Sequence, residues 1–287
     1  MLLKKKTFSE YFNMKIFESS KSELLQKISQ YPDRYTGIFR PTKPKMKIIQ
    51  NLTQSHEIKF GDAIEYIMER YFETKGFEIL EKQIKTNDGV LNLDQCLKKD
   101  NKIIMIEQKV RDDHDSTKKR GQIDNFEKKV YELAAIYGEQ NILAYFYFID
   151  PSLIKNKRYY QQELLKIQKN YEVKCQLLYG DELFKEINCL DIWDELIYNL
   201  KQWKHNLPEF PEINFDKNAV ESFNEIKDIK PIYWLKFFDN EEIIKEIIPV
   251  IFPQKKTLFL LKDFFKQNHK QKVYKTLYIK LNTLLED

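Results

Sequence analysis

The sequence predicts an α/β fold, with a mixed central β-sheet flanked by helices and a small α-helical C-terminal subdomain. Strand-like and helix-like segments alternate between residues 77 and 187, an order that builds a mixed sheet. Two prolines interrupt residues 206–218, and helical patterning continues from there to the C-terminus. We therefore expect a helical segment and basic arm over 1–54, a core over 55–205 and a helical subdomain over 206–287.

Composition is that of a soluble globular protein, with 42% hydrophobic and 32% charged residues. The 48 basic and 44 acidic residues nearly cancel, so the distribution of charge matters more than its sum. Three cysteines without a pair at metal-ligand spacing predict reduced, buried thiols. The N-terminus lacks the apolar region of a signal peptide and no run approaches a membrane span. We expect a cytoplasmic protein that does not enter a membrane.

Residues 31–47 contain three prolines and an excess of basic residues, which predicts an extended loop or arm. Its basic side chains could contact phosphates. They are Arg34, Arg40, Lys43, Lys45 and Lys47. A solvated connecting loop explains the same composition, and both interpretations stay open.

The segment from His56 to Lys75 predicts an amphipathic helix that Gly76 ends. The apolar stripe consists of Phe60, Ile64, Ile67, Met68 and Tyr71. A second face carries Asp62, Glu65, Glu69 and Glu73. Acidic helix faces are usually solvated, which is our interpretation of Glu69 and Glu73. Residues 77–80 then begin an extended segment.

Two alternating apolar runs between Val90 and Arg111 predict a β-hairpin, because the lysines, Asp and Asn between them are typical of a turn. Glu107 and Lys109 are two residues apart and share one face of the second strand. The first strand can bring Asp94 opposite them. Converging charges on a half-buried sheet are costly unless something uses them, and a divalent cation would. The alternative is a surface hairpin whose charges serve solubility alone.

The hairpin is followed by polar residues 112–116, where Asp115 and Ser116 are candidate N-caps. His114 lies in a solvated loop by our interpretation, because no second histidine stands at ligand spacing. The next expected elements are a helix over 117–137, strands over 141–149 and 171–179, and helices over 161–169 and 181–187. On the helix over 117–137, a basic face opposes the apolar stripe and carries Lys118, Lys119, Arg120, Lys128 and Lys129.

Phosphodiester hydrolysis requires an activated water and stabilisation of charge on the phosphate, and hard cations held by oxygen ligands provide both. Magnesium needs only one or two carboxylates. Asp94 and Glu107 would suffice, with the backbone carbonyl of Gln108 as a third ligand. Lys109 adds a compact positive charge that could position the water or steady the phosphate.

Asp94, a spacer of 12 residues and Glu107-Gln108-Lys109 resemble the signature of the PD-(D/E)xK nuclease superfamily, above all its type II restriction endonucleases. Residues 59–65 and 75–80 resemble its first core helix and strand, and 178–184 resemble a late strand–helix junction. This resemblance implies that Glu65 lies beside the metal with a catalytic role. One departure is that Leu93 stands where the motif has proline.

The resemblance also implies Mg²⁺-dependent cleavage of double-stranded DNA by a homodimer at a short, palindromic site. In a restriction-modification system a cognate DNA methyltransferase is then expected genetically rather than as a physical partner. A repair or junction-resolving nuclease would share the same core, and a non-catalytic DNA-binding protein could keep the fold. We favour restriction because the arm and the tail supply segments for reading bases.

The helix after the hairpin is the first candidate for DNA contact. Lys118, Lys119 and Arg120 could hold phosphates, or Arg120 could read guanine, while Gln122 and Asn125 could read adenine. The other expected DNA contacts are Arg111, Arg40, Lys43 and Lys45. An exposed helix face, packed by its stripe on the sheet or on a second subunit, explains the same pattern.

Overall fold

The structure is a computed structural model that describes the chain except residues 1, 4, 88, 112–115 and 287. The chain forms two compact units, residues 1–12 with 61–206 and residues 13–60 with 207–287. The expected N-terminal segment therefore contributes to both units. All three cysteines are free and buried, as predicted. In the described part of the chain, no helix has both the length and the apolar character that a membrane span requires.

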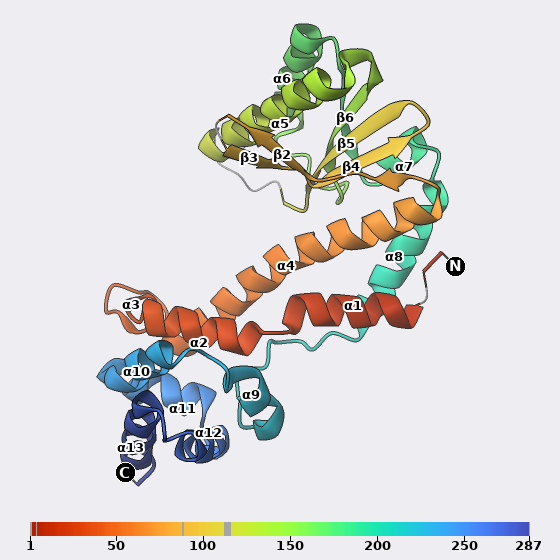
Figure 1. Cartoon of the computed structure of the whole chain (residues 1–287). Coiled ribbons are helices and arrows are strands. Elements are labelled where there is room, and N and C mark those ends of the chain that lie inside the picture. Colours follow the sequence, from red (N-terminus) through yellow and green to blue (C-terminus); the bar gives the residue numbers. More distant parts are fainter. Residues whose placement is uncertain (1, 4, 88, 112–115, 287) are drawn as a thin grey trace. The chain divides into compact units, whose positions relative to one another are not determined.

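The first unit contains a mixed five-stranded sheet in the order β1-β4-β5-β6-β7 (Figure 1). The strands are β1 (Glu78–Ile79), β4 (Gln95–Lys99), β5 (Lys102–Lys109), β6 (Ile142–Phe148) and β7 (Lys174–Tyr179). β1, β4 and β5 pair antiparallel, whereas β5, β6 and β7 pair parallel. This mixed sheet with helices around it confirms the predicted fold class.

The predicted hairpin forms between β4 and β5, but its first strand is divided. Residues 89–92 form β3 (Gly89–Asn92), which pairs with β2 (Gln83–Thr86) in a separate two-stranded sheet. The chain changes sheets at Leu93, whose N–H donates to the carbonyl of Lys82 at 2.7 Å. Asp94 therefore lies between two strands and not within one, contrary to the prediction of a continuous strand.

Helices cover both faces of this sheet. α5 (Ser116–Tyr137) and α6 (Lys157–Tyr171) pack on one face, where Phe126 and Tyr160 contact the ring of Phe146. The last turns of α4 (Pro44–Thr74), with α7 (Glu182–Glu186) and α8 (Leu190–His205), lie on the other face. There Phe184 of α7 contacts Tyr147 of β6 and Phe72 of α4. The sequence had not predicted α8.

The basic arm is less extended than predicted. α3 (Asp33–Thr36) follows its first proline, and α4 begins at Pro44, so residues 31–32 and 37–43 are the irregular parts of the arm. Proline suits the first position of a helix, since its missing N–H has no intrahelical partner there. Ile48 and Leu52 are buried and extend the apolar face of α4 toward its N-terminus.

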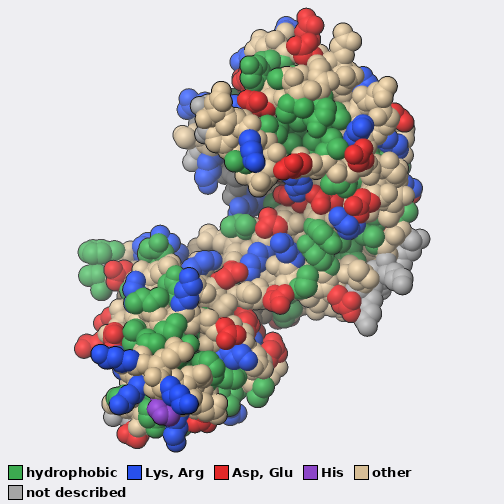
Figure 2. All heavy atoms as spheres, in the orientation of Figure 1, with side chains coloured by type: hydrophobic (Ala, Val, Ile, Leu, Met, Phe, Trp, Pro, Cys, Tyr) green, Lys and Arg blue, Asp and Glu red, His purple; other side chains and the backbone are tan. Residues whose placement is uncertain are grey.

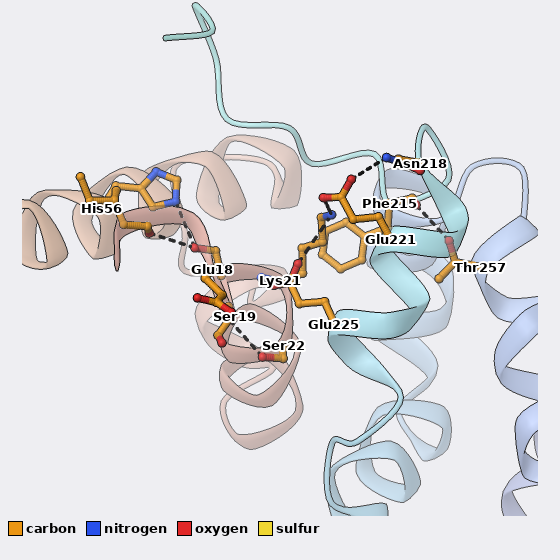
Figure 3. Close-up of polar contacts among 12 residues, drawn as sticks. Glu18, Ser19, Lys21, Ser22, His56, Phe215, Asn218, Glu221, Glu225 and Thr257 are labelled. Carbon is orange, nitrogen blue, oxygen red and sulfur yellow. Dashed lines mark hydrogen bonds and ion pairs between the residues drawn. The ribbon is translucent and has the colours of Figure 1, made fainter. Parts of the chain in front are cut away.

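The second unit is helical and joins the N-terminal segment to the C-terminal one. The end of α1 (Lys5–Phe17), α3 and the first part of α4 belong to it. Its other helices are α2 (Ser20–Gln30), α9 (Ala219–Ile226), α10 (Pro231–Asp239), the π-helix Ile243–Ile247, α11 (Ile248–Ile251), α12 (Lys256–Gln267) and α13 (Lys272–Glu286). Figure 3 shows the link between α2 and α9: Lys21 Nζ lies 3.5 Å from Glu221 and 3.6 Å from Glu225. Leu24 and Ile28 of α2 share a core with Trp234 of α10.

Candidate active site

Asp94, Glu107 and Lys109 come together at the C-terminal end of β5. Lys109 Nζ lies 2.7 Å from Glu107 Oε1 and 3.5 Å from Asp94 Oδ2. The backbone N–H of Gln108 donates to Asp94 Oδ2 at 2.8 Å and holds that carboxylate beside the strand. The Glu107 side chain is only 4% exposed. Two carboxylates therefore flank one ammonium group at the end of a central strand.

A fourth charged side chain enters this cluster from α5. Lys129 is 2% exposed, and its Nζ donates to Glu107 Oε2 at 2.6 Å. The prediction that Lys129 belongs to the basic solvent face is wrong. Lys129 is three residues after Phe126 and four before Leu133, and residues at this spacing lie on the same side of a helix. This spacing in the sequence could have indicated that Lys129 is buried. The reason for its burial is visible only in the structure, where the buried Glu107 of β5 faces it.

Glu107 and Lys109 stabilise each other's charge. Burial favours a neutral Glu107, but Lys109 and Lys129 outweigh it and hold the pKa of Glu107 below its ordinary value. Burial likewise disfavours a charged Lys109, but Glu107 and Asp94 outweigh it and raise the pKa of Lys109. Asp94 differs, because burial and then the charge of Glu107 raise its pKa. Of the two acids, Glu107 therefore keeps its charge more firmly than Asp94.

Glu65 lies on α4 and takes part in the same electrostatic network. Its backbone carbonyl accepts a hydrogen bond from Gln95 Nε2 at 2.7 Å, which ties α4 to β4. Burial, and then the charge of Asp94, raise the pKa of Glu65 to about 7. Lys82 Nζ lies 3.7 Å from Glu65 and 2.8 Å from Glu69. Glu69 is 9% exposed, so its expected place on a solvated face is wrong.

A family model described as type II restriction endonuclease, HinfI, matches residues 4–92 and 79–204, well over half of the chain. The chain belongs to the HinfI family of type II restriction endonucleases. Comparison with curated proteins and with solved structures gave no match. The matched part of this restriction endonuclease chain contains Asp94, Glu107, Lys109 and Lys129.

The acidic cluster of the endonuclease suits a hard divalent cation. Asp94 and Glu107 already converge on a cationic group, the Lys109 ammonium. The pairing of β4 with β5 stops at Ile106, and the Gln108 N–H beyond it points to Asp94. The N–H and C=O of one strand residue point the same way, so the Gln108 carbonyl also points to the side of β5 on which Asp94 lies. Among the described residues no group of three or more His, Cys, Asp or Glu side chains could hold a metal, so Mg²⁺ would rely on two carboxylates, the carbonyl and water.

The residues predicted to contact DNA separate into three sets. Arg111, Lys118, Arg120 and Asn125 are exposed in the first half of α5 or just before it. Lys119 and Gln122 turn toward α6 instead: Lys119 Nζ lies 3.4 Å from Asn156 Oδ1, and Gln122 accepts a hydrogen bond from the Tyr160 hydroxyl at 2.8 Å. Arg40, Lys43 and Lys45 are exposed in the second unit. The calls made for His114 and the cap Asp115 lie outside the described residues.

The Lys129–Glu107 pair should be measurable as stability. Lys129→Met keeps the apolar stem but leaves the buried Glu107 carboxylate with one lysine, so we expect a loss of up to about 3 kcal/mol in the free energy of unfolding. The exposed neighbour Lys128→Met is the matched control, with a change within about 0.5 kcal/mol. Urea unfolding measures both. In a Glu107→Gln background the cost of Lys129→Met should shrink, because no buried charge remains to be paired. Equal stability of the two methionine variants would contradict the assignment.

Glu65 should make the metal-free enzyme less stable as the pH rises. Its folded pKa of about 7 exceeds the unfolded value of 4.5, so between these values the folded state binds more protons. The loss of stability from ionising Glu65 in the folded state is therefore absent below the lower pKa and complete above the upper one. We expect the unfolding free energy of wild type to fall relative to Glu65→Gln by up to about 3 kcal/mol across that interval. Urea unfolding in EDTA at a series of pH values tests this. A difference between wild type and Glu65→Gln that stays flat across this pH interval would refute the coupling.

Proposed function

We propose that this restriction endonuclease hydrolyses both strands of duplex DNA within a short, palindromic site in an Mg²⁺-dependent reaction. The observation that carries the proposal is the Lys109 ammonium held between Glu107 and Asp94 at the end of β5. Family membership supports cleavage of DNA, and the oxygen-only donors support a hard cation.

Each of the two proposed carboxylate ligands has one oxygen already held by the chain. Lys129 holds Glu107 Oε2, and the Gln108 N–H holds Asp94 Oδ2. Glu107 Oε1 has Lys109 as its partner, and Lys109 would give up this contact to a cation. The freed ammonium would remain within the cluster to orient a water or to contact a phosphate oxygen. Bound magnesium would supply polarisation of the phosphate and acidification of a water.

Homodimer formation is part of the proposal, because a two-fold protein presents two equivalent sites to the two strands of a palindrome. Glu65 would act beside the cation through its effect on Asp94, to which it is electrostatically coupled. We keep the predicted contacts of Arg111, Lys118, Arg120 and Asn125 with DNA, since all four are exposed. Base reading by Gln122 is disfavoured by its hydrogen bond to Tyr160.

Plasmid cleavage in Mg²⁺ and in EDTA tests the function. We expect discrete fragments in Mg²⁺ only, and Lys109→Ala should lower the cleavage rate by about 100-fold or more while duplex binding is kept. Lys102→Ala is the control at the exposed opposite end of β5 and should cut like wild type. Cleavage by Lys109→Ala at the wild-type rate would refute its role. Cuts at branched or damaged DNA alone would indicate a resolving or repair nuclease, and binding without any cut would indicate a non-catalytic protein.

A further inference from the structure

Among the described large apolar side chains, Ile38 and Phe39 are the most exposed, at 89% and 92%. They occupy the two corner positions of a turn in the second unit that the N–H of Arg40 closes by donating to the carbonyl of Gly37 at 3.1 Å. Corner side chains of such a turn project away from the chain. The two apolar groups therefore form the tip of the segment between α3 and α4.

This tip is anchored on both sides. Tyr35 before it and Ile48 after it are buried in the helical core, at 2% and 0% exposure. A Cβ at Gly37 would come within 2.5 Å of the Asp33 carbonyl oxygen, so the turn leaves α3 too closely to allow a side chain. Pro41 and Pro44 then restrict the backbone on the return. A tip built in this way is preorganised, which lowers the entropic cost of binding.

Basic residues surround the tip. Residues 31–47 contain five basic side chains and one acid, Asp33. Arg40, Lys43 and Lys45 are exposed, and the Arg34 guanidinium lies 4.2 Å from the centre of the Tyr31 ring. Figure 2 shows a hydrophobic protrusion beside Lys and Arg side chains where Figure 1 places α3 and the loop to α4. Apolar and cationic side chains therefore lie on the same segment of the surface.

We propose that Phe39, with Ile38 beside it, inserts as a wedge between base pairs of duplex DNA while Arg40, Lys43 and Lys45 contact the flanking phosphates. The proposal rests on the proposed function for its partner. Apolar side chains that enter a base step offset the cost of unstacking by the contacts that a bent duplex makes. The cations beside the tip match the polyanionic backbone on either side of such a step.

Charge distinguishes this tip from Phe210, another exposed ring in the same unit. Phe210 is also 70% exposed, but Glu209 and Glu212 flank it, so a phosphate backbone would be repelled there. A second copy of the chain fits the tip poorly, because a two-fold contact would bring two basic surfaces together. Duplex DNA is the occupant that suits both the apolar tip and its charge.

The salt dependence of DNA binding separates the wedge from the phosphate contacts. Fluorescence anisotropy with a labelled duplex in EDTA, across about 50 to 200 mM salt, would give Kd and its slope for each variant. Phe39→Ala should bind about 5- to 150-fold more weakly at every salt concentration with the slope unchanged, since the lost contact is apolar stacking. Phe39→Trp should bind like wild type. A variant with Arg40, Lys43 and Lys45 all changed to Ala should lower the slope by about three.

Phe210→Ala is the matched control and should bind like wild type, and thermal melting should show that all variants are folded. Wild-type affinity of Phe39→Ala would overturn the wedge while the proposed function stands. A change of sedimentation in place of DNA affinity in Phe39→Ala would overturn it in favour of a protein contact. Failure of the wild-type chain to bind any duplex would overturn the wedge and the proposed function together.

Discussion

The ionised carboxylate of Glu107, buried between β5 and α5, is the constraint on which the site depends. A carboxylate at 4% exposure is strongly destabilising without partners. Lys109 from the same strand and Lys129 from the covering helix supply them. Because these lysines come from different layers, Glu107 has both partners only when α5 is docked on the sheet. The interaction that makes the site possible also joins two elements of the fold.

The nearby lysines stabilise the charge of Glu107 more than the charges of Asp94 and Glu65, and this difference matters for metal binding. Two lysines hold the pKa of Glu107 down, whereas Asp94 and Glu65 have raised pKa values because of burial and of neighbouring acids. A divalent cation is often the largest charge in such a site, and it would lower the pKa values of Asp94 and Glu65 that burial and neighbouring acids raise. Under the proposed metal binding, Glu107 would be the acid that is already ionised, while Asp94 and Glu65 would gain most from the arrival of positive charge.

Local sequence patterns predicted those features of the site that depend on a single segment of the chain. The alternation around Glu107 and Lys109 placed both on one face of a strand, and the apolar run over 141–149 predicted its buried neighbour β6. Patterns did not show which segments pair. The run at Val90 alternates as a strand should, yet it pairs with β2 and leaves Asp94 between two sheets. Lys129 was missed for the same reason, since its burial is decided by an acid on another element.

Charged side chains are usually exposed and large apolar ones buried, but Glu107 is a buried charge and Phe39 an exposed apolar ring. One is a charge inside the first unit and the other a large ring that is 92% exposed in the second. Each costs stability or solubility in the free protein, and such exceptions are expected where function needs them. The partners that would relieve them differ in kind: a cation and a phosphate for the buried acid, and stacked bases for the exposed ring. Under the two proposals, duplex DNA with its metal ions contains all of these groups, so one ligand would account for two exceptions that share no local cause.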